Sequence, residues 1–140
     1  MAAIWQHVQH RFRAVLVALG LSLVLGRTAG GGASTGLSGN YVDDTMAVAQ
    51  SLLTTIAIPQ DDPGHAAAET EARALINNYM ARYRPQSRVN GLSSFTTMQT
   101  ALNSLAGHYT NYANRPLPDA LRERLEKELH KAERNVVRGA

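Results

Sequence analysis

Residues 95–112 read FTTMQTALNSLAGHYTNY, and they combine a helical apolar stripe with a complete absence of charged residues. The large apolar side chains recur every three or four positions, at Phe95, Met98, Leu102, Leu105 and Tyr109. This spacing places them on one face of an α-helix. An ordinary exposed helix carries Lys and Glu on its other face, and this segment has only Thr, Asn, Ser and Gln there. We therefore predict a helix buried on most sides, with a partner-binding face as the alternative.

Three further segments show apolar residues at helical spacing. The predicted stripes are Val42, Met46, Ala49, Leu53 and Ile56; Ala68, Ala72, Leu75, Tyr79 and Tyr83; and Leu121, Leu125, Leu129, Ala132 and Val136. Pro59 ends the first segment, residues 41–57, because proline removes a backbone donor and clashes with the preceding turn. Asp62 and Pro63 suit the cap and first position of the second helix, which Pro85 stops. Pro118 precedes the last helix.

The pattern predicts an all-α fold. Amphipathic segments of about 15 to 20 residues joined by short links are typical of an antiparallel up-down-up-down four-helix bundle. No run of alternating or β-branched residues suggests a strand. We assign this bundle domain to residues 34–140.

Residues 1–33 have the pattern of an export leader. A basic start containing Arg11 and Arg13 precedes the apolar run AVLVALGLSLVL at residues 14–25, and small residues follow. This order is typical of a secretory signal, and the run is shorter than the about 20 apolar residues of a membrane span. A cut near Ala33 is plausible, and an uncleaved membrane anchor is the alternative. The stretch 24–26 (VLG) resembles the approach to a lipoprotein cleavage site, but Arg27 stands where cysteine would be required.

Charge gives no support for nucleic-acid binding. The chain has 14 Lys and Arg against 11 Asp and Glu. Arg11, Arg13 and Arg27 all lie in the leader, which has no acidic residue, so the part from Ser34 onward holds eleven of each sign and is formally neutral. The electrostatic signature of a nucleic-acid binder is therefore missing. With no cysteine in the chain, a disulfide framework and thiolate chemistry are excluded as well.

No motif indicates an enzyme. His65, His108 and His130 do not belong to a recognisable metal-ligand pattern, and a zinc site needs about four converging ligands. Di-metal sites in bundles use inward Glu-x-x-His units, and we expect the glutamates here to point outward. Neither a nucleophile elbow nor a phosphate-binding loop is present. We expect a non-enzyme without metal or cofactor, whose Tyr79, Tyr83, Tyr109 and Tyr112 pack in the core and do not form a platform for bases.

Several stretches resemble one family. They are SFTTMQTALNSLAGHYTNYANRPLP at residues 94–118, YVDDT at 41–45, EARALINNYMARY at 71–83 and LRERLEKEL at 121–129. The chain resembles the small photosystem II assembly and repair factor of the thylakoid lumen, the Psb-twenty-seven family. The likeness covers roughly residues 37–136, almost the whole predicted domain.

The resemblance implies a four-helix bundle that binds and does not catalyse. The partner would be the luminal side of photosystem II intermediates, next to the luminal loop of the smaller chlorophyll-binding inner-antenna subunit. The protein would act before the manganese–calcium oxygen-evolving cluster is active and leave when the extrinsic subunits bind. We expect a monomer peripheral to the luminal side of the thylakoid membrane, with a lipid anchor in doubt at Arg27. The alternative is a generic exported helical adaptor with an unknown partner.

The candidate partner surface follows the third predicted helix. The similarity to the family continues past the helix into a loop, where core packing does not explain it. We predict that His108, Tyr112, Asn114 and Arg115 contact the partner. Two alternatives remain: His108 closes the helix C-terminus, and Asn114 and Arg115 hold the ends of two helices together.

Overall fold

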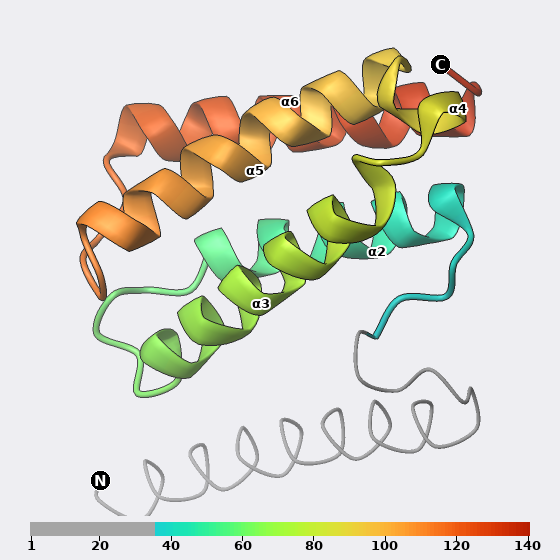
Figure 1. Cartoon of the computed structure of the whole chain (residues 1–140). Helices are drawn as coiled ribbons and strands as arrows, with labels where there is room; N and C mark the ends of the chain where they lie inside the picture. Colours follow the sequence, from blue (N-terminus) through green and yellow to red (C-terminus); the bar gives the residue numbers. More distant parts are fainter. Residues whose placement is uncertain (1–35) are drawn as a thin grey trace, which may run out of the picture. The chain divides into compact units, whose positions relative to one another are not determined.

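The computed structural model in Figure 1 describes residues 36–140. This part of the chain contains the helices α2 (Tyr41–Ile56), α3 (His65–Tyr83), α4 (Ser87–Asn90), α5 (Ser93–Asn111) and α6 (Asp119–Val137), and no strand. The described part is therefore all-α, as predicted, and the short helix α4 adds to the four helices that the sequence pattern indicated. The predicted leader and its boundary at Ala33 lie outside the described residues.

The four long helices pack around one apolar core. α2 packs against α3 and α6, and α5 packs against the same two helices. In Figure 1, α5 and α6 lie side by side, and α2 and α3 lie beneath them. Each long helix contributes fully buried side chains to the core, for example Leu52, Tyr79, Leu102 and Leu125. Residues 37–140 form a compact unit.

The stripe predicted for residues 95–112 is confirmed. All five of its apolar side chains are buried, and α5 also buries Ala101 and His108. Thr100 and Asn103 lie on the exposed side of the same helix. The helix is thus mostly buried, and its uncharged polar side still meets solvent.

The stripe predicted for the first helix is rotated relative to the observed one. Val42 is 40% exposed, and the buried positions of α2 include Thr45, Val48 and Leu52. The side chain of Leu53 is only partly buried. The cause is Thr45, whose hydroxyl lies 2.8 Å from the hydroxyl of Tyr79, so that a polar residue occupies a core position. A count of apolar residues alone misses such a position.

The second helix begins later than predicted. Asp62 does not cap it; its carboxylate accepts a hydrogen bond from the backbone N–H of Gly64 at 2.7 Å, within the turn that precedes His65. Pro63 therefore lies in a turn and not in the first helical turn. The expectation that the glutamates point outward is also wrong for Glu69, which is 5% exposed.

Candidate partner-binding site

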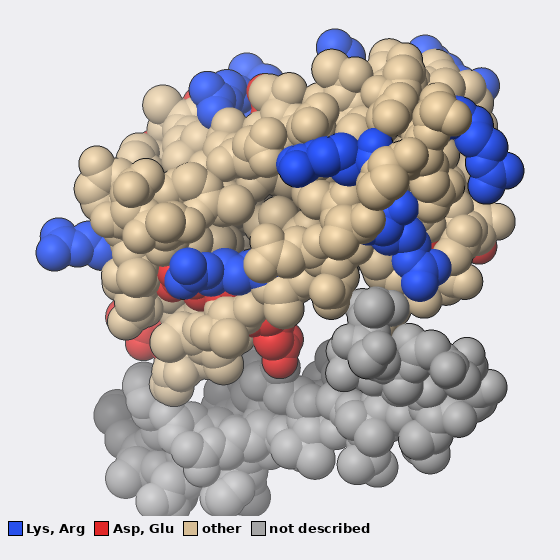
Figure 2. Space-filling model, viewed as in Figure 1, with Lys and Arg blue, Asp and Glu red and all other residues tan. Residues whose placement is uncertain are grey.

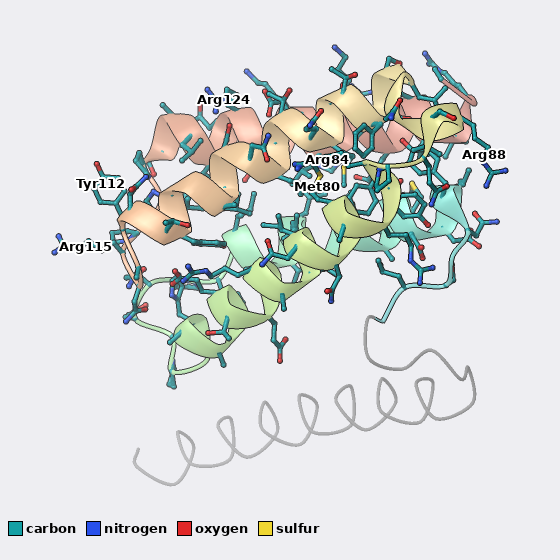
Figure 3. The ribbon with its side chains drawn as sticks, viewed as in Figure 1. Met80, Arg84, Arg88, Tyr112, Arg115 and Arg124 are labelled. Atoms are coloured by element: carbon teal, nitrogen blue, oxygen red, sulfur yellow. The ribbon has the colours of Figure 1, made fainter. Side chains whose placement is uncertain are left out.

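The four predicted contact residues lie where α5 ends and the chain turns toward α6. Figure 3 shows Tyr112 and Arg115 at this end of the helices, with their side chains directed outward. Tyr112 is 57% exposed, so the expectation that it packs in the core is wrong. Arg115 is exposed, whereas His108 is buried. The backbone N–H of Tyr112 donates to the carbonyl of His108 at 2.7 Å and closes the last turn of α5.

His108 supports the loop from beneath. Its Nε2 atom lies 3.3 Å from the carbonyl oxygen of Arg115. Its ring lies against the ring of Tyr112, with centroids 5.4 Å apart and planes inclined by 34°. Because a carbonyl only accepts hydrogen bonds, the Nε2 atom must carry the proton in this contact. His108 therefore contacts both ends of residues 112–115.

Asn114 fixes the conformation of the loop. Its φ angle of 54° lies in the left-handed region, which asparagine adopts more readily than most residues. The backbone N–H of Asn114 donates to the carboxylate of Glu69 at 2.9 Å and 3.2 Å to its two oxygens. The carbonyl of Asn114 accepts a hydrogen bond from Gln60 at 2.7 Å, and its side-chain oxygen lies 3.3 Å from Nδ1 of His65. The loop is thus tied to α3 and to the connection before it.

The buried charge of Glu69 lies under this loop. Burial, together with the negative charge of Glu69, raises the pKa of Tyr109 to about 12. The carboxylate satisfies the N–H of Asn114, which would otherwise have no partner in the turn. The loop therefore depends on one ionisable side chain from another helix.

The contacts divide the four predicted residues into two pairs. His108 and Asn114 position the loop by contacts within the chain. The side chains of Tyr112 and Arg115 extend from that supported loop toward solvent. The geometry thus provides a rigid platform with an exposed aromatic ring and an exposed guanidinium group, which are frequent anchors in protein interfaces.

The sequence pattern does not predict that Gln60, His65 and Glu69 contact Asn114. These residues lie in α3 or just before it, far from Asn114 along the chain. No local spacing links them to the loop, since their common feature is a contact that forms only after α3 and α5 pack together.

A second buried carboxylate holds the N-terminal end of the described chain. Asp44 accepts hydrogen bonds from the backbone N–H groups of Ser38 at 2.7 Å and Gly39 at 3.0 Å, and from the hydroxyl of Tyr83. Burial alone would raise the pKa of Asp44, but the hydrogen bonds from Tyr83, Ser38 and Gly39 outweigh it and hold the pKa below its usual value. Burial and the bond to Asp44 raise the pKa of Tyr83. This cluster fixes residues 38–39 onto α2 and α3.

The described residues offer few other kinds of site. Between residues 36 and 140, no group of three or more His, Asp or Glu side chains is placed to hold a metal ion. No helix in this same range is long and apolar enough to cross a membrane. The loop after α5 therefore remains the candidate site in this part of the chain.

Known proteins provide close matches over nearly the whole chain. The family described as Photosystem II Pbs27 matches residues 7–136. The chain is 49% identical over 130 residues to the photosystem II assembly factor lipoprotein Psb27 of Thermosynechococcus vestitus, covering 93% of this chain and 97% of the relative. It is 33% identical over 100 residues to the photosystem II repair protein PSB27-H1 of Arabidopsis thaliana, covering 71% of this chain and 58% of that protein.

A solved structure agrees with these matches. The solution structure of Psb27 from cyanobacterial photosystem II is similar, with a TM-score of 0.72 and 50% identity over 76% of this chain and 93% of that one. The class that the fold defines is a small all-helical protein. The chain belongs to the Psb27 family of photosystem II proteins.

Proposed function

We propose that this protein is a non-catalytic accessory factor that binds assembly or repair intermediates of photosystem II on their luminal face. The observation that carries the proposal is the match to the family over residues 7–136, together with relatives named as an assembly factor and a repair protein. In this role the protein assists biogenesis or repair of the manganese–calcium cluster and keeps the extrinsic subunits away until that step is finished. The contact is the luminal loop of the smaller chlorophyll-binding inner-antenna subunit.

The proposed frame is an antiparallel up-down-up-down bundle of the four long helices, with α4 as part of the link between α3 and α5. The packing of α2 and α5 against both α3 and α6 supports it. A rigid frame of this kind holds the loop after α5 in one conformation before the partner arrives. Pre-organisation reduces the entropy lost on binding.

We assign the contact at the loop to Tyr112 and Arg115, positioned by His108 and Asn114. The exposure of the first pair and the internal contacts of the second support this division. Replacing Tyr112 and Arg115 by alanine together is expected to weaken binding to photosystem II by at least about tenfold, because aromatic and arginine anchors often carry most of the binding energy. Thermal unfolding of the double variant should match the wild type. Unchanged binding with unchanged folding would show that the loop is not the contact.

We place the mature protein, residues 34–140, at the luminal side of the thylakoid membrane as a peripheral monomer. The relative from Thermosynechococcus vestitus is named a lipoprotein, whereas this chain has no cysteine to which a thioether-linked lipid could be attached. Attachment through photosystem II follows from that difference. N-terminal sequencing of the protein from thylakoid membranes should give a start near Ser34; a start at Met1 would indicate an uncut membrane anchor.

The whole proposal is tested by binding to two forms of purified photosystem II. We expect the protein to co-purify with particles that lack the extrinsic subunits and to be absent from particles that carry them. Equal binding to both forms would contradict the proposed exclusion, and binding to neither would favour the exported-adaptor alternative.

A further inference from the structure

A groove lies between α3 and α5. It has a volume of about 320 Å³, and its lining includes Ile76, Met80, Arg84, Asn103 and Ala106. Figure 3 shows Met80 and Arg84 next to one another where α3 passes α5. Ile76 and Met80 form an apolar floor, and Asn103 lies on the exposed edge.

Arg84 is the one charged residue in the lining of this groove. No Asp or Glu occurs between residues 72 and 118, which include most of α3 and all of α4 and α5. The same stretch holds the arginines Arg73, Arg82, Arg84, Arg88 and Arg115. On the face drawn in Figure 2, tan surface predominates, blue side chains cross it and the few red side chains lie toward its margins. The part of the chain from Ser34 onward is formally neutral, but its positive and negative residues are unevenly distributed.

These arginines have no acidic partner within residues 36–140. The ion pairs found there join Asp119 to Arg122, Arg124 to Glu128 and His130 to Glu133, all within α6. Arg84 is exposed, and only its backbone makes hydrogen bonds, to Met80 and Asn90. An unpaired guanidinium beside an apolar floor is complementary to a carboxylate that stands next to an apolar side chain.

A second groove provides a contrast. It lies between α2 and α6, has a volume of about 370 Å³, and is lined by Met46, Val137, Glu133 and two arginines. Because Glu133 lines this groove together with Arg134 and Arg138, the groove has no single sign of charge. Charge complementarity therefore selects the α3–α5 groove.

Helical spacing indicates the length of the ligand. Arg73, Asn77, Met80 and Arg84 are spaced four, three and four residues apart, so they lie along one stripe of α3. At 1.5 Å per residue, Arg73 and Arg84 lie about 16 Å apart along the axis. An extended chain covers this distance with about five residues.

We propose that the α3–α5 groove binds a short acidic segment of a photosystem II subunit, with an apolar side chain on Met80 and Ala106 and a carboxylate on Arg84. This inference rests on the proposed function and adds a second contact surface to the loop after α5. The segment is extended and about five residues long, and its carboxylates face Arg73 and Arg84.

A pair of charge-reversal variants tests the electrostatic part. Arg84→Glu reverses one charge at the groove, and Lys131→Glu makes the same change in net charge at an exposed position of α6. With photosystem II lacking extrinsic subunits, we expect Arg84→Glu to raise the Kd at least about tenfold, as expected for an arginine anchor. Lys131→Glu should leave it within about twofold, as is usual for a charge outside the interface. Equal effects overturn the inference, and failure of the wild type to bind instead refutes the proposed function.

A photo-crosslinking variant identifies the segment. Asn103→p-benzoylphenylalanine places the reactive group at the exposed edge of the groove, at a side chain with no hydrogen bond to another described residue. Cross-linked peptides from photosystem II should contain Asp or Glu next to an apolar residue. A peptide without acidic residues overturns the proposal, as does the absence of any cross-link in complexes that form normally.

Two rival occupants give different results. Vesicles of phosphatidylglycerol test a lipid surface, and we expect Arg84→Glu to bind them as the wild type does. Loss of vesicle binding in this variant, with photosystem II binding unchanged, would assign the groove to lipid. Sedimentation tests a second copy of this chain: both proteins should be monomers, and a wild-type dimer that Arg84→Glu dissociates would overturn the proposal.

Discussion

Glu69 holds the loop after α5 in place, a role that its position in the sequence does not predict. A carboxylate in the middle of an amphipathic helix is usually a solvated surface group, and the sequence pattern predicts the same for Glu69. In the structure it is buried and accepts a hydrogen bond from the N–H of Asn114, in the loop after α5. A buried carboxylate is tolerated when hydrogen bonds satisfy it. The partner of Glu69 lies 45 residues away along the chain and comes within reach only when α3 packs against α5, so the sequence alone does not predict this role.

Replacing Glu69 by alanine is expected to destabilise the protein by about 1–3 kcal/mol, because it leaves a backbone donor of the loop without its partner. Glu71→Ala is the matched control, since Glu71 lies on the same helix and is exposed. Urea unfolding of the two variants makes the comparison. Equal losses of stability in both would show that the contact with Asn114 contributes nothing.

Asp44 makes stability depend on pH in a defined direction. Its pKa in the folded protein lies below the ordinary value of 3.8, so folding favours the ionised form. The stabilisation is complete above the unfolded value and is lost as the pH falls through the folded value. Asp44→Asn should therefore be less stable than the wild type at pH 7, and the difference should shrink below about pH 4. Urea unfolding across this range measures it; a difference that stays constant with pH would contradict the assignment.

At the scale of the helices, spacing predicts best where large apolar side chains fill most of the buried face. The spacing predicts all five apolar residues of the α5 stripe, because the buried polar side chains of this helix, Ser94 and His108, lie near its two ends. In α2 the buried face includes Thr45, which bonds to Tyr79, and the predicted stripe was rotated toward Val42 and Leu53 as a result. The start of α3 was placed too early, because Asp62 completes a turn before the helix instead of capping it.

Neighbouring leucines of α2 distinguish the observed stripe from the predicted one. Leu52 is 1% exposed and Leu53 is only partly buried. Leu52→Ala should cost about 2–5 kcal/mol, the range for a fully buried leucine, and Leu53→Ala should cost clearly less. Chemical unfolding of both variants gives the answer. A larger loss at Leu53 would restore the predicted stripe and contradict the structure.

For the whole molecule, the net charge does not show how the charged residues are distributed along the chain. The predicted domain is formally neutral, and its net charge therefore gives no support for nucleic-acid binding. The same count gives no sign that residues 72–118 contain arginine and no acid, because the acidic residues lie in α2, in the connection before α3, at the start of α3 and in α6. The four candidate residues lie together at the end of α5, where His108 is buried and Tyr112, Asn114 and Arg115 are exposed. Their contact with a partner stays a prediction.

Salt should reveal this separation of charge. Attraction between the arginines of residues 72–118 and an acidic partner is screened at a Debye length of about 8 Å at 0.15 M salt and about 3 Å at 1 M. Binding to photosystem II should therefore weaken as salt rises, and Arg84→Glu should flatten this dependence. Affinity that does not change with salt would exclude an electrostatic contact.

The most direct test of the account is hydroxyl-radical footprinting of the protein, free and bound to photosystem II without extrinsic subunits. Tyr112 reports the loop after α5, and Met46 reports the groove between α2 and α6. We predict that binding protects Tyr112 from oxidation and leaves Met46 unchanged. Protection of Met46 with no protection of Tyr112 would place the partner on the groove between α2 and α6, and this would contradict the account.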